Sequence, residues 1–117
     1  MELKNAVAAL SALAHDGRLA AFRLLVQAGP EGVAAGEIAR QLDVPANTLS
    51  SNLNILSNAA LIESRREGRS IIYTARYSNM TELLEFLMQD CCGGSPEICA
   101  PLADLALRSR CSPEGRA

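Results

Sequence analysis

The period at which apolar residues recur changes twice along the chain, and this constrains the fold more than any other feature. Apolar residues first recur at helical spacing in four segments, 3–14, 17–28, 35–42 and 46–60. Two β-prone runs, 61–66 and 69–74, then flank Glu67-Gly68, which is typical of a hairpin. Helical spacing returns over 79–91. The sequence therefore predicts a mainly α fold with the element order α-α-α-α-β-β-α.

Only the tight turn Asp43-Val44-Pro45 separates the third and fourth predicted helices. Two helices joined in this way have the form of a helix-turn-helix, and a hairpin directly after them makes it a winged helix-turn-helix. The first and last helices are amphipathic but are not needed inside a small three-helix core. Their apolar faces must be buried against something, and a second copy of the chain is the simplest partner. We therefore predict a homodimer formed through these two helices.

The composition excludes several classes of protein. Hydrophobic residues make up 49% of the 117 residues, which argues against disorder outside the ends. No apolar run approaches the ~20 residues of a membrane span, so no membrane association is expected. The first residues lack the pattern of a signal peptide, which predicts a cytoplasmic protein whose thiols stay reduced.

The predicted helix 46–60 carries a polar but uncharged face, since no charged residue occurs between Val44 and Ile62. An ordinary solvated face is rich in Lys, Glu and Arg, which also favour helix more than Asn or Ser do. Asn can pair with adenine, and Ser or Thr can meet a base edge or a phosphate. We therefore expect this helix to bind double-stranded DNA, with Ser50 on a phosphate and base contacts from Asn47, Thr48, Ser51 and Asn54.

The predicted hairpin supplies the positive charge that the helix lacks. Arg65, Arg66 and Arg69 surround its turn, where a wing would lie along the DNA backbone or in the minor groove. The alternative is that these charges only protect an exposed edge strand. The formal net charge of -2 is compatible with DNA binding, because the positive charge is needed only locally.

All four cysteines, Cys91, Cys92, Cys99 and Cys111, lie in the last quarter of the chain. Gly93-Gly94-Ser95-Pro96 separates the adjacent pair from Cys99 and cannot form a regular helix. Thiolates are soft ligands, so the cluster indicates a soft metal ion. We expect residues 1–92 to form the DNA-binding and dimerisation domain, and residues 93–117 a flexible tail that carries part of the inducer site.

With these elements the chain resembles the ArsR/SmtB family of winged-helix metalloregulators. In Ser51 and Asn52 it departs from the Arg and His that are common in the family, and Ala60 stands where Gly is frequent. The resemblance rests on Leu13-Ala14-His15-Asp16-Gly17-Arg18-Leu19, Leu24-Leu25, Gly36-Glu37-Ile38-Ala39-Arg40-Gln41-Leu42, Thr48-Leu49-Ser50-Ser51-Asn52-Leu53-Asn54-Ile55-Leu56, Ala59-Ala60-Leu61-Ile62 and the Arg65–Tyr73 hairpin.

The resemblance implies a homodimeric transcriptional repressor of a two-fold operator, without enzymatic activity or a permanent cofactor. The family's arsenic motif in the third helix and its zinc ligands on the last helix are missing here. Cys91, Cys92 and Cys99 are instead similar to the three-cysteine site of one arsenic-responsive subgroup. This implies that As(III), or Sb(III), binds these three thiolates as inducer and releases the DNA.

Other interpretations of the cysteines stay open. Methylarsenite needs only two thiolates. Zinc, cadmium or lead would need a fourth ligand, for which Cys111 or His15 is available. A disulfide between Cys92 and Cys99 would make a thiol-redox sensor, and inert cysteines are the simplest alternative. A thiol carrier or small reductase is disfavoured, because the chain has no Cys-x-x-Cys, no catalytic His–Cys pairing and no phosphate loop.

Overall fold

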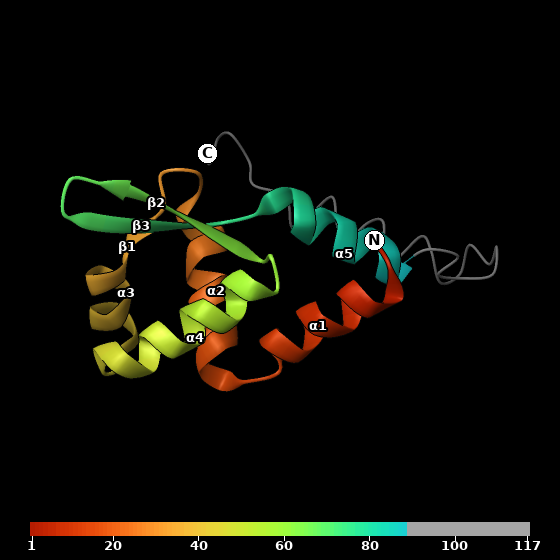
Figure 1. The fold of residues 1–117 in the computed structure, drawn as a ribbon, viewed down its shortest axis with the longest axis horizontal. Helices are drawn as coiled ribbons and strands as arrows, with labels where there is room; N and C mark the ends of the chain where they lie inside the picture. Colours follow the sequence, from red (N-terminus) through yellow and green to blue (C-terminus); the bar gives the residue numbers. More distant parts are fainter. Residues whose placement is uncertain (89–117) are drawn as a thin grey trace. The chain divides into compact units, whose positions relative to one another are not determined.

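The computed structural model describes residues 1–88, and in this part of the chain five helices and three strands follow one another (Figure 1). The predicted winged helix-turn-helix is confirmed, with one additional short strand. The elements are α1 (Leu3–Leu13), α2 (Asp16–Ala28), β1 (Val33–Ala34), α3 (Ala35–Leu42), α4 (Ala46–Asn58), β2 (Ile62–Glu67), β3 (Ser70–Ala75) and α5 (Tyr77–Met88).

The additional strand β1 has only two residues, so it leaves no periodic pattern in the sequence. It pairs antiparallel with β3, with Val33 opposite Tyr73 and Ala34 opposite Ile72. The sheet order is therefore β1-β3-β2, and the hairpin β2–β3 forms the wing. β1 supports the wing only at Ile72 and Tyr73 in the middle of β3, since its two residues reach no further toward the turn.

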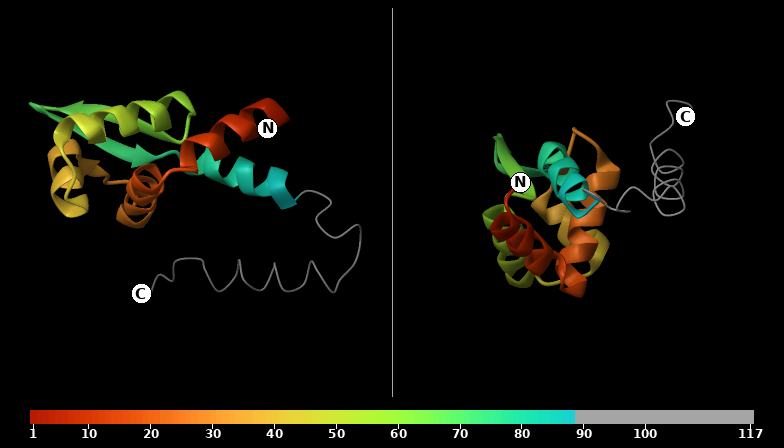
Figure 2. Two further views of the ribbon diagram at one scale, coloured as in Figure 1. Left: turned by 90° about the horizontal axis from the view of Figure 1, so that it is seen from below. Right: turned by 90° about the vertical axis from the view of Figure 1, so that its right-hand side faces the viewer.

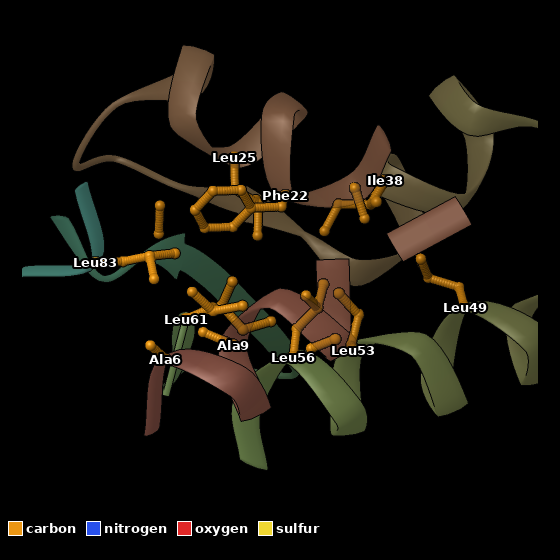
Figure 3. Close-up of a cluster of buried hydrophobic side chains, with 14 residues drawn as sticks. Ala6, Ala9, Phe22, Leu25, Ile38, Leu49, Leu53, Leu56, Leu61 and Leu83 are labelled. Carbon is orange, nitrogen blue, oxygen red and sulfur yellow. The ribbon is translucent and has the colours of Figure 1, made fainter. Parts of the chain in front are cut away.

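The core lies where α2, α3 and α4 meet the base of the wing. The largest fully buried side chains come from all of these elements (Figure 3), and they are Leu25, Ile38, Leu53, Leu56, Leu61 and Ile62. Helical spacing fixes which side chains of α3 and α4 share a face, and the buried apolar residues of that face are Ile38, Leu49, Leu53 and Leu56. Burial of such side chains is the main stabilising contribution to a domain of this size.

The first helix has two apolar faces where one was expected. Its buried face carries the small residues Ala6, Ala9 and Ala12, and α1 packs through it against α2 and α4. Its larger residues point outward: Leu3 is 68% exposed, Val7 54% and Leu10 42%. A sequence pattern does not distinguish two adjacent apolar faces from one broad face, so only the packing shows which side is covered.

The last described helix is fixed at its beginning and exposes apolar residues further along. The Tyr77 hydroxyl donates to the carbonyl oxygen of Val26 at 3.1 Å, and Asn79 Nδ2 donates to that of Ala60 at 2.6 Å. Leu83 is buried, whereas Leu84 and Leu87 are 49% and 50% exposed. α5 therefore ends in an apolar face that the described residues do not cover.

The end of α4 uses a left-handed residue that is not glycine. The Leu61 N–H donates to the Leu56 carbonyl and the Ala60 N–H to the Ser57 carbonyl, which is the Schellman pattern. Ala60 takes φ 61° at the position where this motif favours glycine. The departure from the family pattern noted in the sequence is thus a site of backbone strain.

We expect Ala60→Gly to raise the free energy of unfolding by about 1 kcal/mol, because it removes the Cβ penalty of the left-handed conformation. Urea unfolding should show a higher midpoint with an unchanged m-value. The matched control is Ala59→Gly, since Ala59 has an ordinary φ of -84° and should only lose stability. A midpoint lowered equally by both substitutions would contradict the left-handed geometry.

Candidate nucleic-acid interface

Helix α4 is sharply divided into a buried and an exposed stripe. Leu49, Leu53 and Leu56 face the core. The five residues predicted to meet DNA are all exposed on this helix, namely Asn47, Thr48, Ser50, Ser51 and Asn54. Four of them follow the spacing i, i+3, i+4, i+7, so they form one continuous stripe. The structure therefore presents a row of amide and hydroxyl groups with no charged side chain among them.

Asn52 belongs to the buried stripe, although its sequence neighbours are polar and exposed. It is 7% exposed and is the one buried polar residue within residues 1–88. A Cβ added to Gly17 would lie 3.0 Å from Asn52 Nδ2, so the amide packs directly against the beginning of α2. This departure from the family pattern therefore affects the α2–α4 contact, while the departure at Ser51 affects the exposed face.

The helix-turn-helix contributes little free positive charge. Arg40 on α3 donates from Nε to Glu37 Oε1 at 2.9 Å, and Gln41 Nε2 donates to Glu37 Oε2 at 2.8 Å. The hydrogen bond from Arg40, followed by that from Gln41, lowers the pKa of Glu37 to about 2. Glu37 therefore stays ionised at neutral pH and offsets the charge of Arg40.

The wing lies along the same side of the fold as α4, with α2 on the other side (Figure 2). Residues opposite each other in the hairpin share one face of the sheet. Arg66 is opposite Ile71, and Ile71 and Tyr73 line a hollow of about 270 Å³ together with Ala39 of α3 and Ser50 of α4. Arg66 thus belongs to the face of the wing that is turned toward the helix-turn-helix.

The adjacent residue Arg65 belongs to the opposite face and is engaged within the protein. Its Nε is 2.7 Å from Glu67 Oε2, and its two terminal nitrogens donate to the carbonyl oxygens of Glu31 at 2.7 Å and Pro30 at 3.4 Å. The guanidinium groups of Arg66 and Arg69 have no hydrogen bond or ion pair with other groups of residues 1–88. The three predicted wing arginines are therefore not equivalent.

The predicted inducer ligands Cys91, Cys92 and Cys99 lie outside the described residues, as does Cys111. Among residues 1–88, no three His, Cys, Asp or Glu side chains are grouped so that they could hold a metal ion. His15 instead caps α2: its Nδ1 accepts hydrogen bonds from the N–H groups of Gly17 at 3.1 Å and Arg18 at 3.4 Å. Its capping role has no signal in the sequence, because His is not a preferred N-cap residue.

No helix in the part of the chain described by the structure is long and apolar enough to cross a membrane.

Known proteins share both the sequence pattern and the fold. A family described as a helix-turn-helix domain matches residues 13–65. The biofilm growth-associated repressor of Agrobacterium fabrum is 33% identical over 78 residues, which are 67% of this chain and 64% of that protein. The chain thus spans slightly less than two thirds of that repressor's length.

Solved structures extend the comparison. HlyU from Vibrio cholerae is 29% identical, with a TM-score of 0.59 over 74% of this chain and 97% of that one. The crystal structure of a fragment, residues 1–100, of a possible transcriptional regulatory protein from Mycobacterium bovis is 30% identical. Its TM-score is 0.60 over 74% of this chain and 89% of that one. A solution structure of the same fragment is 28% identical, with a TM-score of 0.58 over 75% of this chain and 84% of that one. It is described as the homodimeric winged helix-turn-helix DNA-binding domain of a possible ArsR-family transcriptional regulator.

The winged helix-turn-helix order, the helix-turn-helix match and these relatives together identify the chain as a winged helix-turn-helix protein that is similar to transcriptional regulators, among them a possible member of the ArsR family.

Proposed function

We propose that this protein is a homodimeric repressor that binds a two-fold DNA operator and releases it when As(III) binds its C-terminal cysteines. The observation that carries the DNA-binding part is the exposed, uncharged stripe of α4 beside a wing with two arginines that have no partner within residues 1–88. The repressor role is supported by the name of the Agrobacterium fabrum relative.

In this proposal α4 enters the major groove and reads base edges through Asn47, Thr48, Ser51 and Asn54. Ser50, Arg66 and Arg69 meet phosphates, which fix the register of the helix without carrying sequence information. Because α4 brings no charged side chain, the wing would supply much of the salt-dependent part of the affinity. The two-fold symmetry of a dimer places equivalent half-sites about one helical turn, ~34 Å, apart.

The dimer is proposed to form through the outward faces of α1 and α5. These faces expose large apolar side chains to water, and contiguous exposed apolar patches mark interaction sites. They comprise Leu3, Val7 and Leu10 on α1, and Leu84, Leu87 and Met88 on α5. The solution structure of the Mycobacterium bovis relative is that of a homodimer, which supports the same assembly here.

The proposed inducer is a trivalent arsenic species bound by Cys91, Cys92 and Cys99. As(III) makes three bonds and keeps a lone pair, so three thiolates match its valence, and thiolates suit soft ions. The three cysteines directly follow the proposed dimer helix in the sequence. We place the protein in the cytoplasm, where thiols stay reduced.

The test of both parts is the mobility of the protein's own promoter fragment in a gel. We expect the protein to retard this fragment, and arsenite under strong reductant to weaken the binding roughly 5- to 150-fold, the usual range of allosteric coupling. Absence of retardation would reject the DNA-binding proposal. Release by an oxidant alone would favour the thiol-redox sensor. This alternative is supported by the similarity to HlyU from Vibrio cholerae, which has been solved in a form described as reduced.

Serine variants identify which thiols respond. Cys91→Ser, Cys92→Ser and Cys99→Ser should each retain DNA binding and lose the arsenite response. Cys111→Ser is the matched control and should still respond. If Cys99→Ser loses the response to arsenite but still responds to methylarsenite, the inducer is an organoarsenical held by two thiolates. A response to zinc, cadmium or lead that requires Cys111 would indicate a metal with four ligands instead.

A further inference from the structure

We propose that Arg65 positions the wing and does not contact DNA, whereas Arg66 on the opposite face of the same strand is the phosphate contact. This assignment rests on the proposed DNA binding, but its structural half can be tested without DNA. It assigns different roles to two adjacent arginines that the sequence alone does not distinguish.

Arg65 ties the outer strand of the sheet to the loop before β1. In the order β1-β3-β2, the strand that carries Arg65 is separated from β1 by β3. The side chain nevertheless reaches the carbonyl oxygens of Pro30 and Glu31. Arg65 therefore bridges from one edge of the sheet to the loop at the other edge.

The bridge is located where the third strand ends. β1 pairs only with Ile72 and Tyr73 of β3, and Arg65 is opposite Ile72. From Arg66 to Ile71 the wing is a two-stranded ribbon, and such ribbons are only marginally stable in water. Fixing the hairpin at Arg65 therefore limits the movement of the whole outer ribbon, which carries Arg66 and Arg69.

The chemistry of the bridge suits an arginine in particular. The guanidinium is a planar fork whose several N–H groups can satisfy different acceptors at once. Here the Arg65 Nε–H donates to the Glu67 carboxylate, and the two terminal nitrogens donate to the carbonyl oxygens of Pro30 and Glu31. The Glu67 carboxylate also offsets the charge of Arg65. A lysine would keep the positive charge but could not hold three acceptors in this plane.

The face of the sheet separates Arg66 from these partners. Arg66 lies on the side of Ile71 and Tyr73, which line the hollow shared with α3 and α4. Ser50 of the polar stripe of α4 lines the same hollow, and the guanidinium of Arg66 is not engaged by residues 1–88. A phosphate that flanks the groove occupied by α4 would therefore be met by Arg66.

The experiment compares Arg65→Lys, Arg65→Ala and Arg66→Ala in the full-length chain. Operator affinity is measured over a range of salt concentrations, because each phosphate contact contributes about 1 to the slope of log K against log salt. We expect Arg66→Ala to lower the slope by about 1. Both Arg65 variants should bind several-fold more weakly with the slope of the wild type.

Hydrogen exchange without DNA tests the bridge independently. Amides of residues 63–73 should exchange faster in both Arg65 variants and at the wild-type rate in Arg66→Ala. The assignment is overturned if Arg65→Lys behaves as wild type in both measurements while Arg65→Ala loses about one unit of slope, since Arg65 would then be a phosphate contact. If the wild type binds no DNA, the proposed function fails, while unchanged exchange in the Arg65 variants would reject the bridge by itself.

Discussion

Val7→Glu is expected to convert the dimer into a monomer and to weaken operator binding by about 10²- to 10⁴-fold. Val7 lies between Leu3 and Leu10 on the outward face of α1. A carboxylate at this position would be buried without a partner in the proposed interface, which disfavours association strongly. Each monomer would then bind a half-site alone, and the affinity gained by joining two DNA-binding domains in one dimer would be lost.

Sedimentation equilibrium measures the assembly, and a salt-matched DNA titration measures the affinity. The control is Ala8→Glu, which adds the same charge to the next residue of α1, exposed but turned away from the Leu3–Leu10 face. It should remain dimeric. Because Val7 is 54% exposed in the single chain, Val7→Glu should leave the helical content unchanged. A Val7→Glu protein that remains a dimer would reject the assembly through α1.

Gly32→Ala is expected to lower the free energy of unfolding by about 3 kcal/mol, the largest effect of a single methyl group that we predict. Gly32 has φ 76°, and an added Cβ would lie 2.6 Å from the carbonyl oxygen of Tyr73. The same Cβ would lie 2.7 Å from methyl groups of Ile72 and Thr74. The loop must therefore move away from β3, and the pairing of β1 would be lost with it.

The control for this prediction is Gly29→Ala. Gly29 has a similar φ of 82°, but an added Cβ would meet nothing within 4 Å. Gly29 also has ψ -170°, a conformation that is nearly restricted to glycine, so this substitution should cost only backbone strain, about 1–3 kcal/mol, and less than Gly32→Ala. Thermal unfolding of both variants separates the two contributions. Equal losses of stability would show that the loop does not pack on β3 in solution.

The sequence predicted the elements that depend only on residues close to one another in the chain. Helical spacing in α3 and α4 placed Ile38, Leu53 and Leu56 inside, and the structure buries all three. The same spacing predicted the exposed polar stripe of α4, because residues three and four apart share a helix face. The change of period after residue 60 predicted the hairpin, since β-prone runs around a glycine form a turn regardless of their partners.

The sequence did not predict features that depend on a neighbour far away in the chain. Asn52 appeared to be one polar residue among many, but α2 covers it. β1 exists only because β3 offers it a pairing edge. The arsenic site stays a prediction, because its three cysteines lie outside the described residues.

The sequence alone thus determined the order of the elements, the two stripes of α4 and the presence of arginines around the turn of the wing. Only the tertiary structure decided that α1 packs through its alanines and presents Val7 outward, and that Arg65 is held by the loop while Arg66 has no partner within residues 1–88. The physical reason is the same in both cases. A periodic pattern fixes which residues share a face, but the elements packed around that face decide which of them meets protein and which is left for a partner.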